Sequence, residues 1–252
     1  MNIVKNNLSE IPRVPMDVDS LQNMSFIPPK PLPPKSFAMY IVGAPGSGKS
    51  NLWQALLLSH PTKKRPDKPR YYYRAFDRVE LISGSLQTLP KQLLSKIPDE
   101  QQHNKYSDAL LTDLVDEMRE DENLNNLIVM DDVIRDLTRS HILSKCILNR
   151  RHCTHDSGKD NHGGLSMMVT SQKYSLLPLE MRNAMSHVII FRSQNSTEVN
   201  RLKEELMGDL NKDQQDELLE LAWSQPYSFL MIAVNAPRSE RYFVKFDKVV
   251  IE

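Results

Sequence analysis

Residues 43–50, Gly-Ala-Pro-Gly-Ser-Gly-Lys-Ser, have the spacing of a loop that binds phosphate groups. The glycines let backbone N–H groups turn inward around phosphate oxygens, and the N-terminus of a following helix adds its positive dipole end. In this pattern Lys49 reaches the β- and γ-phosphates, and the hydroxyl of Ser50 ligates Mg²⁺. A chance glycine-rich turn is disfavoured, because a strand-like and a helix-like segment flank the loop. The predicted nucleotide-binding residues are Gly43, Ala44, Pro45, Gly46, Ser47, Gly48, Lys49, Ser50 and Asn51.

Two adjacent carboxylates, Asp131 and Asp132, follow the apolar run at 127–130. A carboxylate at the end of a buried strand beside the phosphate loop can hold Mg²⁺ through water, and we assign this role to Asp131. Asp132 is then the candidate that orients or activates the attacking water. The alternative is that Asp132 caps the next helix. A second acidic residue after the metal-binding aspartate favours hydrolysis over phosphate transfer to a small acceptor.

The motifs of other phosphate-loop classes are absent. The segment 211–214 begins like the Asn-Lys-x-Asp motif that reads guanine but lacks its final aspartate, and no Leu-Ser-Gly-Gly-Gln transporter signature occurs. By exclusion, we expect ATP as the nucleotide and Mg²⁺ as the metal.

The segments around these residues alternate between strand and helix patterns. We expect strands at 37–42, 127–130, 165–171 and 187–191, a β-prone aromatic run at 70–76, and helices at 49–59, 106–120, 138–151, 197–207 and 212–223. Such alternation implies an α/β fold with a mostly parallel sheet and helices on both faces. The segments 227–234 and 241–246 resemble a hairpin, which would add antiparallel strands at an edge.

Residues 1–35 are rich in proline and read as an extended arm, because proline fixes φ and removes backbone donors. The arm could bind an aromatic groove, or lie across a neighbouring subunit or its own core. Residues 36–252 are expected to form a single domain, for which this length suffices.

The composition bears on the partners and on the cellular location of the protein. The 32 basic and 32 acidic residues cancel, so bulk charge predicts no polyanionic partner. Two cysteines are too few for a disulfide framework, no apolar run is long enough for a membrane span, and the N-terminus lacks the apolar core of a signal peptide. We expect an intracellular protein that is not secreted.

With the phosphate loop, "LIVMDD", "NRRH" and "MMVTSQ" in this order, the chain resembles the HerA/FtsK superfamily, and in particular the genome-packaging ATPases of double-stranded DNA viruses. The resemblance covers roughly residues 37–195, the length of an ATPase core. It implies a RecA-like (ASCE) P-loop fold. It also implies a ring oligomer that uses ATP hydrolysis to drive double-stranded DNA into a preformed capsid.

The resemblance also implies roles for individual residues and for partners. In this family a polar residue senses the γ-phosphate or positions water, and it lies at the tip of the strand next to the one that ends in the metal-binding aspartate. Gln172 takes that position here. The alternative is that Gln172 is a polar strand end that faces solvent. An arginine finger is supplied across a subunit boundary, with Arg182 preferred, then Arg151, then Arg192. The implied partners are sequence-independent duplex DNA and capsid-vertex or portal-like proteins. The implied location is the host cytoplasm or a viral factory, or the virion.

The sequence contains two further polar segments, at 63–78 and 152–164, whose function has more than one interpretation. Basic residues at 63–78 are interleaved with Tyr71, Tyr72 and Tyr73, which suits either contact with a DNA backbone or a solvated loop followed by a buried strand. The insertion at 152–164 contains three histidines and one cysteine, but their spacing fits no closed zinc site.

Three other functions compete. A translocase or helicase of the same superfamily would act without a capsid. A nucleoside or nucleotide kinase would transfer phosphate to a small acceptor without stimulation by DNA. A nucleotide-gated assembly factor would hydrolyse ATP negligibly, which the intact Lys49, Ser50 and aspartate pair disfavour.

Overall fold

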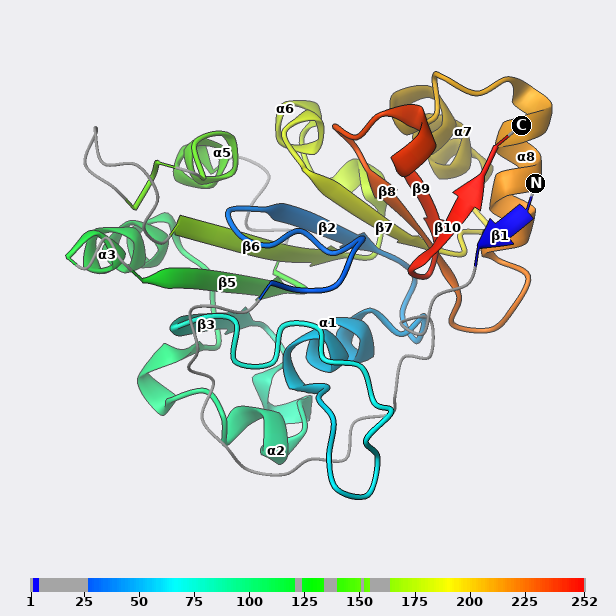
Figure 1. The fold of residues 1–252 in the computed structure, drawn as a ribbon. Coiled ribbons are helices and arrows are strands. Elements are labelled where there is room, and N and C mark those ends of the chain that lie inside the picture. The colour runs from blue at the N-terminus through cyan, green and yellow to red at the C-terminus, as the bar shows by residue number, and fades with distance from the viewer. Residues whose placement is uncertain are drawn as a thin grey trace.

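The structure, a computed structural model, describes residues 2–4, 27–120, 124–133, 140–150, 152–154 and 164–251. These residues build a ten-stranded sheet in the order β1-β10-β9-β8-β7-β2-β6-β5-β3-β4 (Figure 1). The strands are β1 (Asn2–Val4), β2 (Ala38–Val42), β3 (Arg78–Ser83), β4 (Gln102–His103), β5 (Asn125–Asp131), β6 (Gly164–Ser171), β7 (His187–Phe191), β8 (Phe229–Ala233), β9 (Tyr242–Val244) and β10 (Asp247–Val250). The six strands from β7 to β4 run parallel, and the remaining four pair in antiparallel fashion.

Helices cover both faces of this sheet (Figure 1). They are α1 (Lys49–Leu58), α2 (Lys91–Leu94), α3 (Asp108–Arg119), α5 (His141–Leu148), α6 (Leu179–Asn183), α7 (Ser196–Leu206) and α8 (Lys212–Ala222), with 3₁₀ turns at Leu86–Thr88, Asp99–Gln101, Tyr174–Leu176 and Arg238–Glu240. Side-chain caps begin four helices, because an oxygen there accepts an otherwise unpaired N–H of the first turn. The caps of α3, α5, α7 and α8 are Ser107, Ser140, Asn195 and Asn211.

The sheet separates two apolar cores because successive strand residues point to opposite faces. In β2, Ala38, Tyr40 and Val42 pack on one face, whose core also includes buried residues of α3, α5, α6, α7 and α8. Met39 and Ile41 pack on the other face, together with α1 and α2. The central strands are therefore apolar along their whole length, as expected for strands covered on both sides. The predicted α/β class, with a mostly parallel sheet and a C-terminal antiparallel hairpin, is confirmed.

The order of the parallel strands decides where functional residues meet. β6 lies between β2 and β5 and pairs with both in parallel register. Because parallel strands share their carboxyl edge, the segments that follow β2, β5, β6 and β7 open at one edge of the sheet. This edge carries the phosphate loop, the aspartate pair and Gln172.

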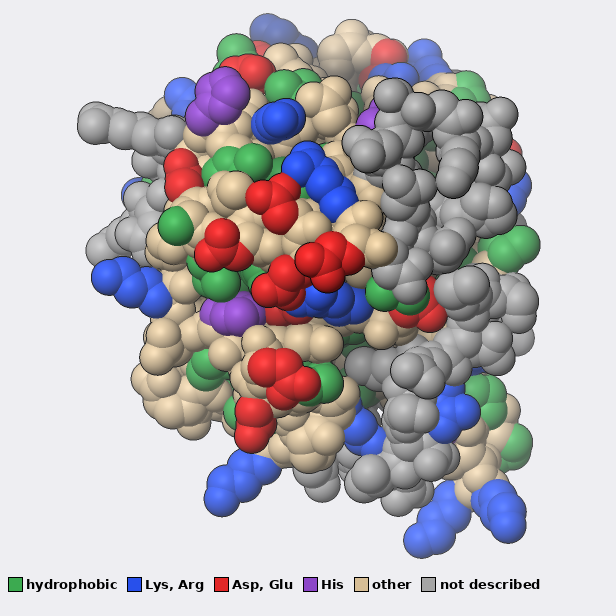
Figure 2. Space-filling model, turned by 90° about the vertical axis from the view of Figure 1, so that its left-hand side faces the viewer, with side chains coloured by type: hydrophobic (Ala, Val, Ile, Leu, Met, Phe, Trp, Pro, Cys, Tyr) green, Lys and Arg blue, Asp and Glu red, His purple; other side chains and the backbone are tan. Residues whose placement is uncertain are grey.

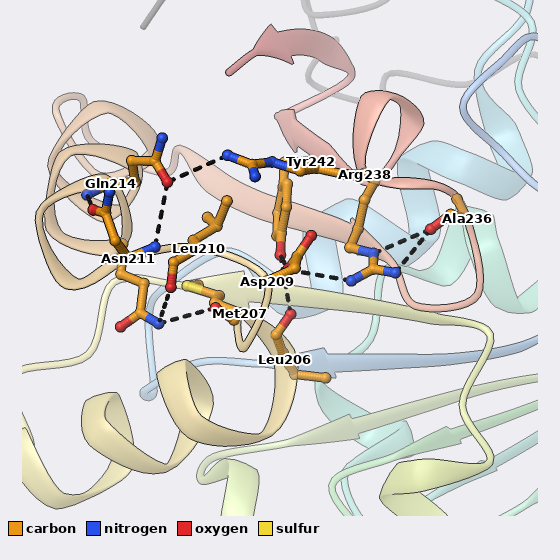
Figure 3. Close-up of polar contacts among 11 residues, drawn as sticks. Leu206, Met207, Asp209, Leu210, Asn211, Gln214, Ala236, Arg238 and Tyr242 are labelled. Atoms are coloured by element: carbon orange, nitrogen blue, oxygen red, sulfur yellow. Dashed lines mark hydrogen bonds and ion pairs between the residues drawn. The ribbon is translucent and has the colours of Figure 1, made fainter. Parts of the chain in front are cut away.

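The C-terminal strands are tied to the turn between α7 and α8 by a polar network (Figure 3). The carboxylate of Asp209 accepts a hydrogen bond from the Tyr242 hydroxyl and pairs with Arg241 at 3.2 Å. Arg238 donates to Gln214 at 3.3 Å, which links the β8–β9 connection to the first turn of α8. These contacts hold α8 against the hairpin, so the segment from α8 to β8 has a defined position next to the parallel strands.

One local expectation was wrong, and several short elements were missed. The aromatic run at 70–76 does not form a strand: residues 71–74 form bends and turns, and the strand begins at Arg78. The short strand β4 and helix α2 were also not predicted. Tyr71 and Tyr72 are fully buried, and their rings pack against Phe246 and Phe37. The aromatic residues therefore anchor the loop to the core, a role that β propensity does not distinguish from a strand.

The described parts of the N-terminal segment contact the body of the protein. β1 pairs antiparallel with β10, so it forms the outer edge of the sheet. Leu32 is buried, and the Tyr72 hydroxyl donates to the carbonyl of Pro33 at 2.8 Å. The division into an arm at 1–35 and a domain at 36–252 stays a prediction. None of the helices in the described ranges is long and apolar enough to cross a membrane.

Candidate nucleotide-binding site

The phosphate loop joins the end of β2 to the start of α1, as the sequence predicts. Gly43 is required by space, because a Cβ there would lie 2.4 Å from Ser47 Oγ and 2.8 Å from Phe191 Cβ. Gly48 is required by conformation, since its φ of 104° is strained for any residue with a side chain. Gly48 is also the N-cap of α1 and offers no capping side chain. The first-turn N–H groups of α1 are therefore available to an anion.

The Lys49 side chain lies within the loop. It is 6% exposed, and its ammonium donates to the carbonyls of Gly43 and Ala44 at 2.8 and 3.2 Å. Burial lowers the pKa of Lys49, while the nearby Asp132 and Asp131 act in the opposite direction. A desolvated ammonium that is held by two carbonyls, with two carboxylates in its surroundings, is well placed to gain from the arrival of a triphosphate.

Asp131 ends β5 and faces the first turn of α1. Its side chain accepts a hydrogen bond from Thr170 Oγ1 at 2.8 Å, and Ser50 Oγ lies 3.4 Å from its other oxygen. Burial raises the pKa of Asp131, the neighbouring Asp132 raises it further, and the hydrogen bond from Thr170 opposes both effects. Because burial is the dominant cause, this carboxylate carries charge in a site that disfavours it until a cation is bound.

Asp132 follows β5 directly and is exposed at the carboxyl edge of the sheet. Its backbone is left-handed, with φ of 56°, which Asp tolerates better than most residues. Its N–H donates to Thr170 Oγ1 at 3.1 Å. The first described helix that follows, α5, has Ser140 as its cap, so Asp132 is not the cap of that helix.

Gln172 comes directly after β6 and is exposed. It lines a cavity of about 470 Å³ together with residues 42–45 of the phosphate-loop segment and Arg192, which follows β7. Because β6 lies between β2 and β5, Gln172 is positioned beside both the phosphate loop and the strand that carries Asp131. This is the strand-tip position that the family resemblance predicts for a γ-phosphate sensor.

The structure describes two of the three arginine candidates, Arg182 and Arg192. Arg182 is 6% exposed, forms a bidentate pair with Glu205 at 2.7 and 2.9 Å, and lies over the ring of Tyr174. An arginine that acts on a neighbouring subunit must project from the surface, so this placement contradicts the preference for Arg182. Arg192 is exposed and lines the same cavity as Gln172, within its own chain. Arg151 lies outside the described residues.

The donor set at this site fits Mg²⁺. Ser50 and Asp131 present hard oxygen ligands close to each other, and carboxylate and hydroxyl oxygens are preferred by this ion. The neighbouring Ser47 Oγ is buried and has no hydrogen-bond partner among the described residues, which leaves a polar atom of the loop free for a ligand. Among the same residues, no group of three or more His, Cys, Asp or Glu side chains could hold a metal.

Thr170 is the functional residue that the motifs did not identify. Its hydroxyl donates to the Asp131 carboxylate and accepts from the Asp132 N–H, so a single side chain on β6 orients both members of the pair. The only signal in the sequence is a polar residue within the apolar run that ends at Ser171. That signal has no meaning until β6 is known to pair with β5.

The basic segment at 63–78 is only partly available to a ligand. Tyr71, Tyr72 and Tyr73 are buried, and Arg78 pairs with Glu80 and Glu117 at 2.6 Å each. The interpretation as aromatic residues interleaved with DNA-binding cations is therefore wrong for the tyrosines. The exposed cations of the loop are Lys63, Lys64 and Arg65. In the 152–164 insertion, Cys153 is buried, and residues 155–163, with two of the three histidines, lie outside the described ranges.

Together, the strand order and the loop define the RecA-like class of P-loop ATPase folds. Residues 30–145 match the model of the FtsK/SpoIIIE family. A comparison with curated proteins finds no sequence match. The family match bears out the predicted resemblance to the HerA/FtsK superfamily over residues 30–145, and the fold is consistent with it.

Solved structures with the same fold include viral packaging enzymes. The genome-packaging NTPase B204 of Sulfolobus turreted icosahedral virus 2, in complex with ATPγS, has a TM-score of 0.56 and 14% identity over 84% of this chain and 97% of that one. The DNA-packaging ATPase B204 of Sulfolobus turreted icosahedral virus has a TM-score of 0.56 and 12% identity over 86% and 99%. The pCW3 conjugation coupling protein TcpA, with ATPγS, has a TM-score of 0.51 and 15% identity over 85% and 61%.

Proposed function

We propose that this protein is an ATP-hydrolysing motor that acts as a ring and translocates double-stranded DNA into a preformed viral capsid. The observation that carries the proposal is the convergence of Lys49, the Asp131–Asp132 pair and Gln172 at one edge of the sheet, with β6 between β2 and β5. The match to the FtsK/SpoIIIE family model and the fold shared with B204 support this assignment.

Phosphate binding follows from the loop. N–H groups of the loop and of the first turn of α1 surround the β- and γ-phosphates of ATP, and Lys49 exchanges its two carbonyl partners for phosphate oxygens. Ser50 and Asp131 would hold Mg²⁺, which would supply positive charge to the phosphates. The desolvated environment of Lys49 strengthens its attraction to the phosphates.

Hydrolysis requires a water molecule in line with the γ-phosphate. Asp132 accepts a proton from that water or orients it, and Thr170 holds the Asp132 backbone in place. Gln172, at the tip of the strand between the phosphate loop and the aspartates, contacts the γ-phosphate or the same water. With Arg182 set aside, the candidates for the arginine supplied by a neighbouring subunit are Arg151 and Arg192, and Arg192 is exposed at the cavity that Gln172 also lines.

We also propose partners and a cellular location for this motor. The motor would assemble as a ring at a capsid vertex, contact portal-like proteins there, and work in the host cytoplasm, a viral factory or the virion. A related translocase that works without a capsid would share the ATPase site. Dependence of DNA uptake on empty capsids distinguishes the two.

The first experiment measures phosphate release by the purified protein with and without long duplex DNA of mixed sequence. We expect turnover that requires Mg²⁺ and rises when DNA is added. Phosphate transfer to added nucleosides or nucleotides would instead identify a kinase. An equal rate of hydrolysis with and without DNA would contradict the proposal of a DNA motor. ATP binding without turnover would favour an assembly factor.

The surface charge limits where DNA can bind. Figure 2 shows the side on which α3 lies in Figure 1, and acidic side chains gather on it. The exposed acidic residues of α3 and its C-terminal end are Asp108, Asp113, Asp116, Glu117 and Glu120. Asp116 and Glu117 pair with Arg119 and Arg78, whereas the other carboxylates of this group disfavour contact with a phosphate backbone. The loop with Lys63, Lys64 and Arg65 projects from the lower side of the molecule in Figure 1.

Reversing the charge of Lys63, Lys64 and Arg65 to glutamate is expected to weaken DNA binding without affecting the fold, because all three side chains are exposed. If each contacts a phosphate, the slope of log affinity against log salt becomes shallower by about 0.9 per lost contact. Fluorescence anisotropy of a labelled duplex at several salt concentrations measures both quantities.

The matched control reverses three exposed lysines elsewhere, Lys91, Lys105 and Lys212, which changes the net charge equally. If both triple variants bind DNA with the same affinity and salt slope, the 63–65 loop is not the contact surface and only net charge matters.

A further inference from the structure

Tyr227 is an exposed aromatic residue in an unfavourable backbone conformation. It lies in the turn between α8 and β8, its exposed fraction is 69%, and its φ is 60°. The left-handed region costs a bulky residue about 1–2 kcal/mol. No hydrogen bond of the Tyr227 hydroxyl occurs among the described residues, and the ring belongs to neither apolar core. The fold therefore has no evident use for this side chain.

The position of Tyr227 relative to the phosphate loop is well defined. Its ring atom Cδ1 lies 3.5 Å from the point that a Cβ on Gly48 would occupy, and Phe191 Cε1 lies 3.6 Å from the same point. The turn is anchored, because the indole N–H of Trp223 donates to the carbonyl of Ile190 in β7 at 3.2 Å. Two aromatic rings thus flank the N-cap of α1, and the Tyr227 ring is the exposed one.

The strand order determines which end of a nucleotide comes near this ring. β5 and β6, which carry Asp131, Thr170 and the Gln172 tip, lie on one side of β2, whereas β7 and β8 lie on the other. The terminal phosphate must be directed towards the aspartates for hydrolysis. The nucleoside end of the triphosphate then leaves the loop on the side of β7 and β8. Tyr227 lies two residues before the start of β8 on that side.

We propose that the Tyr227 ring contacts the base of the bound nucleoside triphosphate by stacking. This inference rests on the proposed nucleotide site and adds a residue that determines how the base, rather than the phosphates, is held. A π-face contact is tolerant of base identity, because every base presents a π-face. Tyr227 therefore increases affinity for nucleoside triphosphates without reading the edge of the base.

The test compares Tyr227→Ala and Tyr227→Phe with the wild-type chain by calorimetric titration of a non-hydrolysable β,γ-imido analogue of ATP and of inorganic tripolyphosphate. Tyr227→Ala is expected to weaken binding of the ATP analogue by about 5- to 100-fold. Its affinity for tripolyphosphate, which has no base, stays unchanged. Tyr227→Phe keeps the ring and retains the affinity of the wild type.

Tyr227→Gly separates the ring from the backbone, because glycine adopts this φ without strain. This variant is expected to unfold at a temperature no lower than that of the wild type, because relief of backbone strain offsets the greater chain entropy of glycine, and to bind the ATP analogue as weakly as Tyr227→Ala. An equal loss of affinity for tripolyphosphate would mean that the ring only shapes the phosphate loop. Wild-type affinity for the ATP analogue in Tyr227→Ala would exclude a base contact. Either result overturns the inference about Tyr227 and leaves the proposed nucleotide site standing. If the wild type binds neither compound, the proposed nucleotide site is overturned and the inference falls with it.

Discussion

Replacing Asp132 with asparagine is expected to leave ATP binding intact and to lower turnover by about 10²- to 10⁴-fold, the usual contribution of a general base. Asparagine adopts the left-handed backbone of this position as readily as aspartate, so the N–H bond to Thr170 persists. The side chain loses its negative charge and its ability to accept a proton, but keeps its size and shape. Steady-state phosphate release together with calorimetric binding of ATP separates chemistry from affinity.

Thr170 provides the accompanying control. Thr170→Val removes the hydroxyl that orients both aspartates and should lower turnover, whereas Thr170→Ser keeps the hydroxyl and should retain most of it. If Asp132→Asn hydrolyses ATP at the wild-type rate, another group prepares the water and the assignment of Asp132 fails.

Replacing Asp131 with asparagine is expected to have two opposite effects. Turnover should fall by at least about 10³-fold, because charge stabilisation by a bound metal is worth several kcal/mol. The ligand-free protein should become more stable at neutral pH, since a buried carboxylate is replaced by an uncharged group that still accepts the bond from Thr170. Each kcal/mol gained raises the melting temperature by about 2–4 °C for a chain of this size.

The pH dependence of this stability gain has a defined sign. Burial raises the pKa of Asp131 in the folded state above its value in the unfolded chain, so the unfolded state releases this proton at a lower pH. The penalty of the charged carboxylate is fully present above the folded-state pKa and disappears as the pH falls towards the unfolded value. The difference in melting temperature between Asp131→Asn and the wild type should therefore shrink on acidification.

Asp132→Asn serves as the matched control for stability, because Asp132 is exposed and its replacement removes no buried charge. Thermal unfolding without nucleotide or Mg²⁺, at several pH values, measures all three proteins. A lower melting temperature for Asp131→Asn at neutral pH would show that the contacts of the charged form with Thr170 and Ser50 outweigh its desolvation.

Features that depend on local chemistry could be predicted well. The phosphate loop, the helix that follows it and the strand that ends at Asp131 have short-range signals in glycine spacing, apolar runs and helix periodicity. The helices at Ser196–Leu206 and Lys212–Ala222 were predicted within a residue or two, because an amphipathic repeat and an Asn cap mark each of them. The strand of Arg78–Ser83 was missed although residues 78–81 alternate between polar and apolar, because the aromatic run before it was predicted as the β-prone segment. Gln102–His103 is too short to show a pattern.

Features that depend on which strands become neighbours could not be predicted. The sequence by itself determined that the chain carries a triphosphate loop, a pair of aspartates and alternating strands and helices. Only the tertiary structure decided that Thr170 bridges the two aspartates, that Arg182 is buried against Glu205, and that Tyr227 lies beside Gly48. The physical reason is that these contacts join residues far apart in the chain. Strand order and side-chain burial, which no local pattern encodes, bring them together.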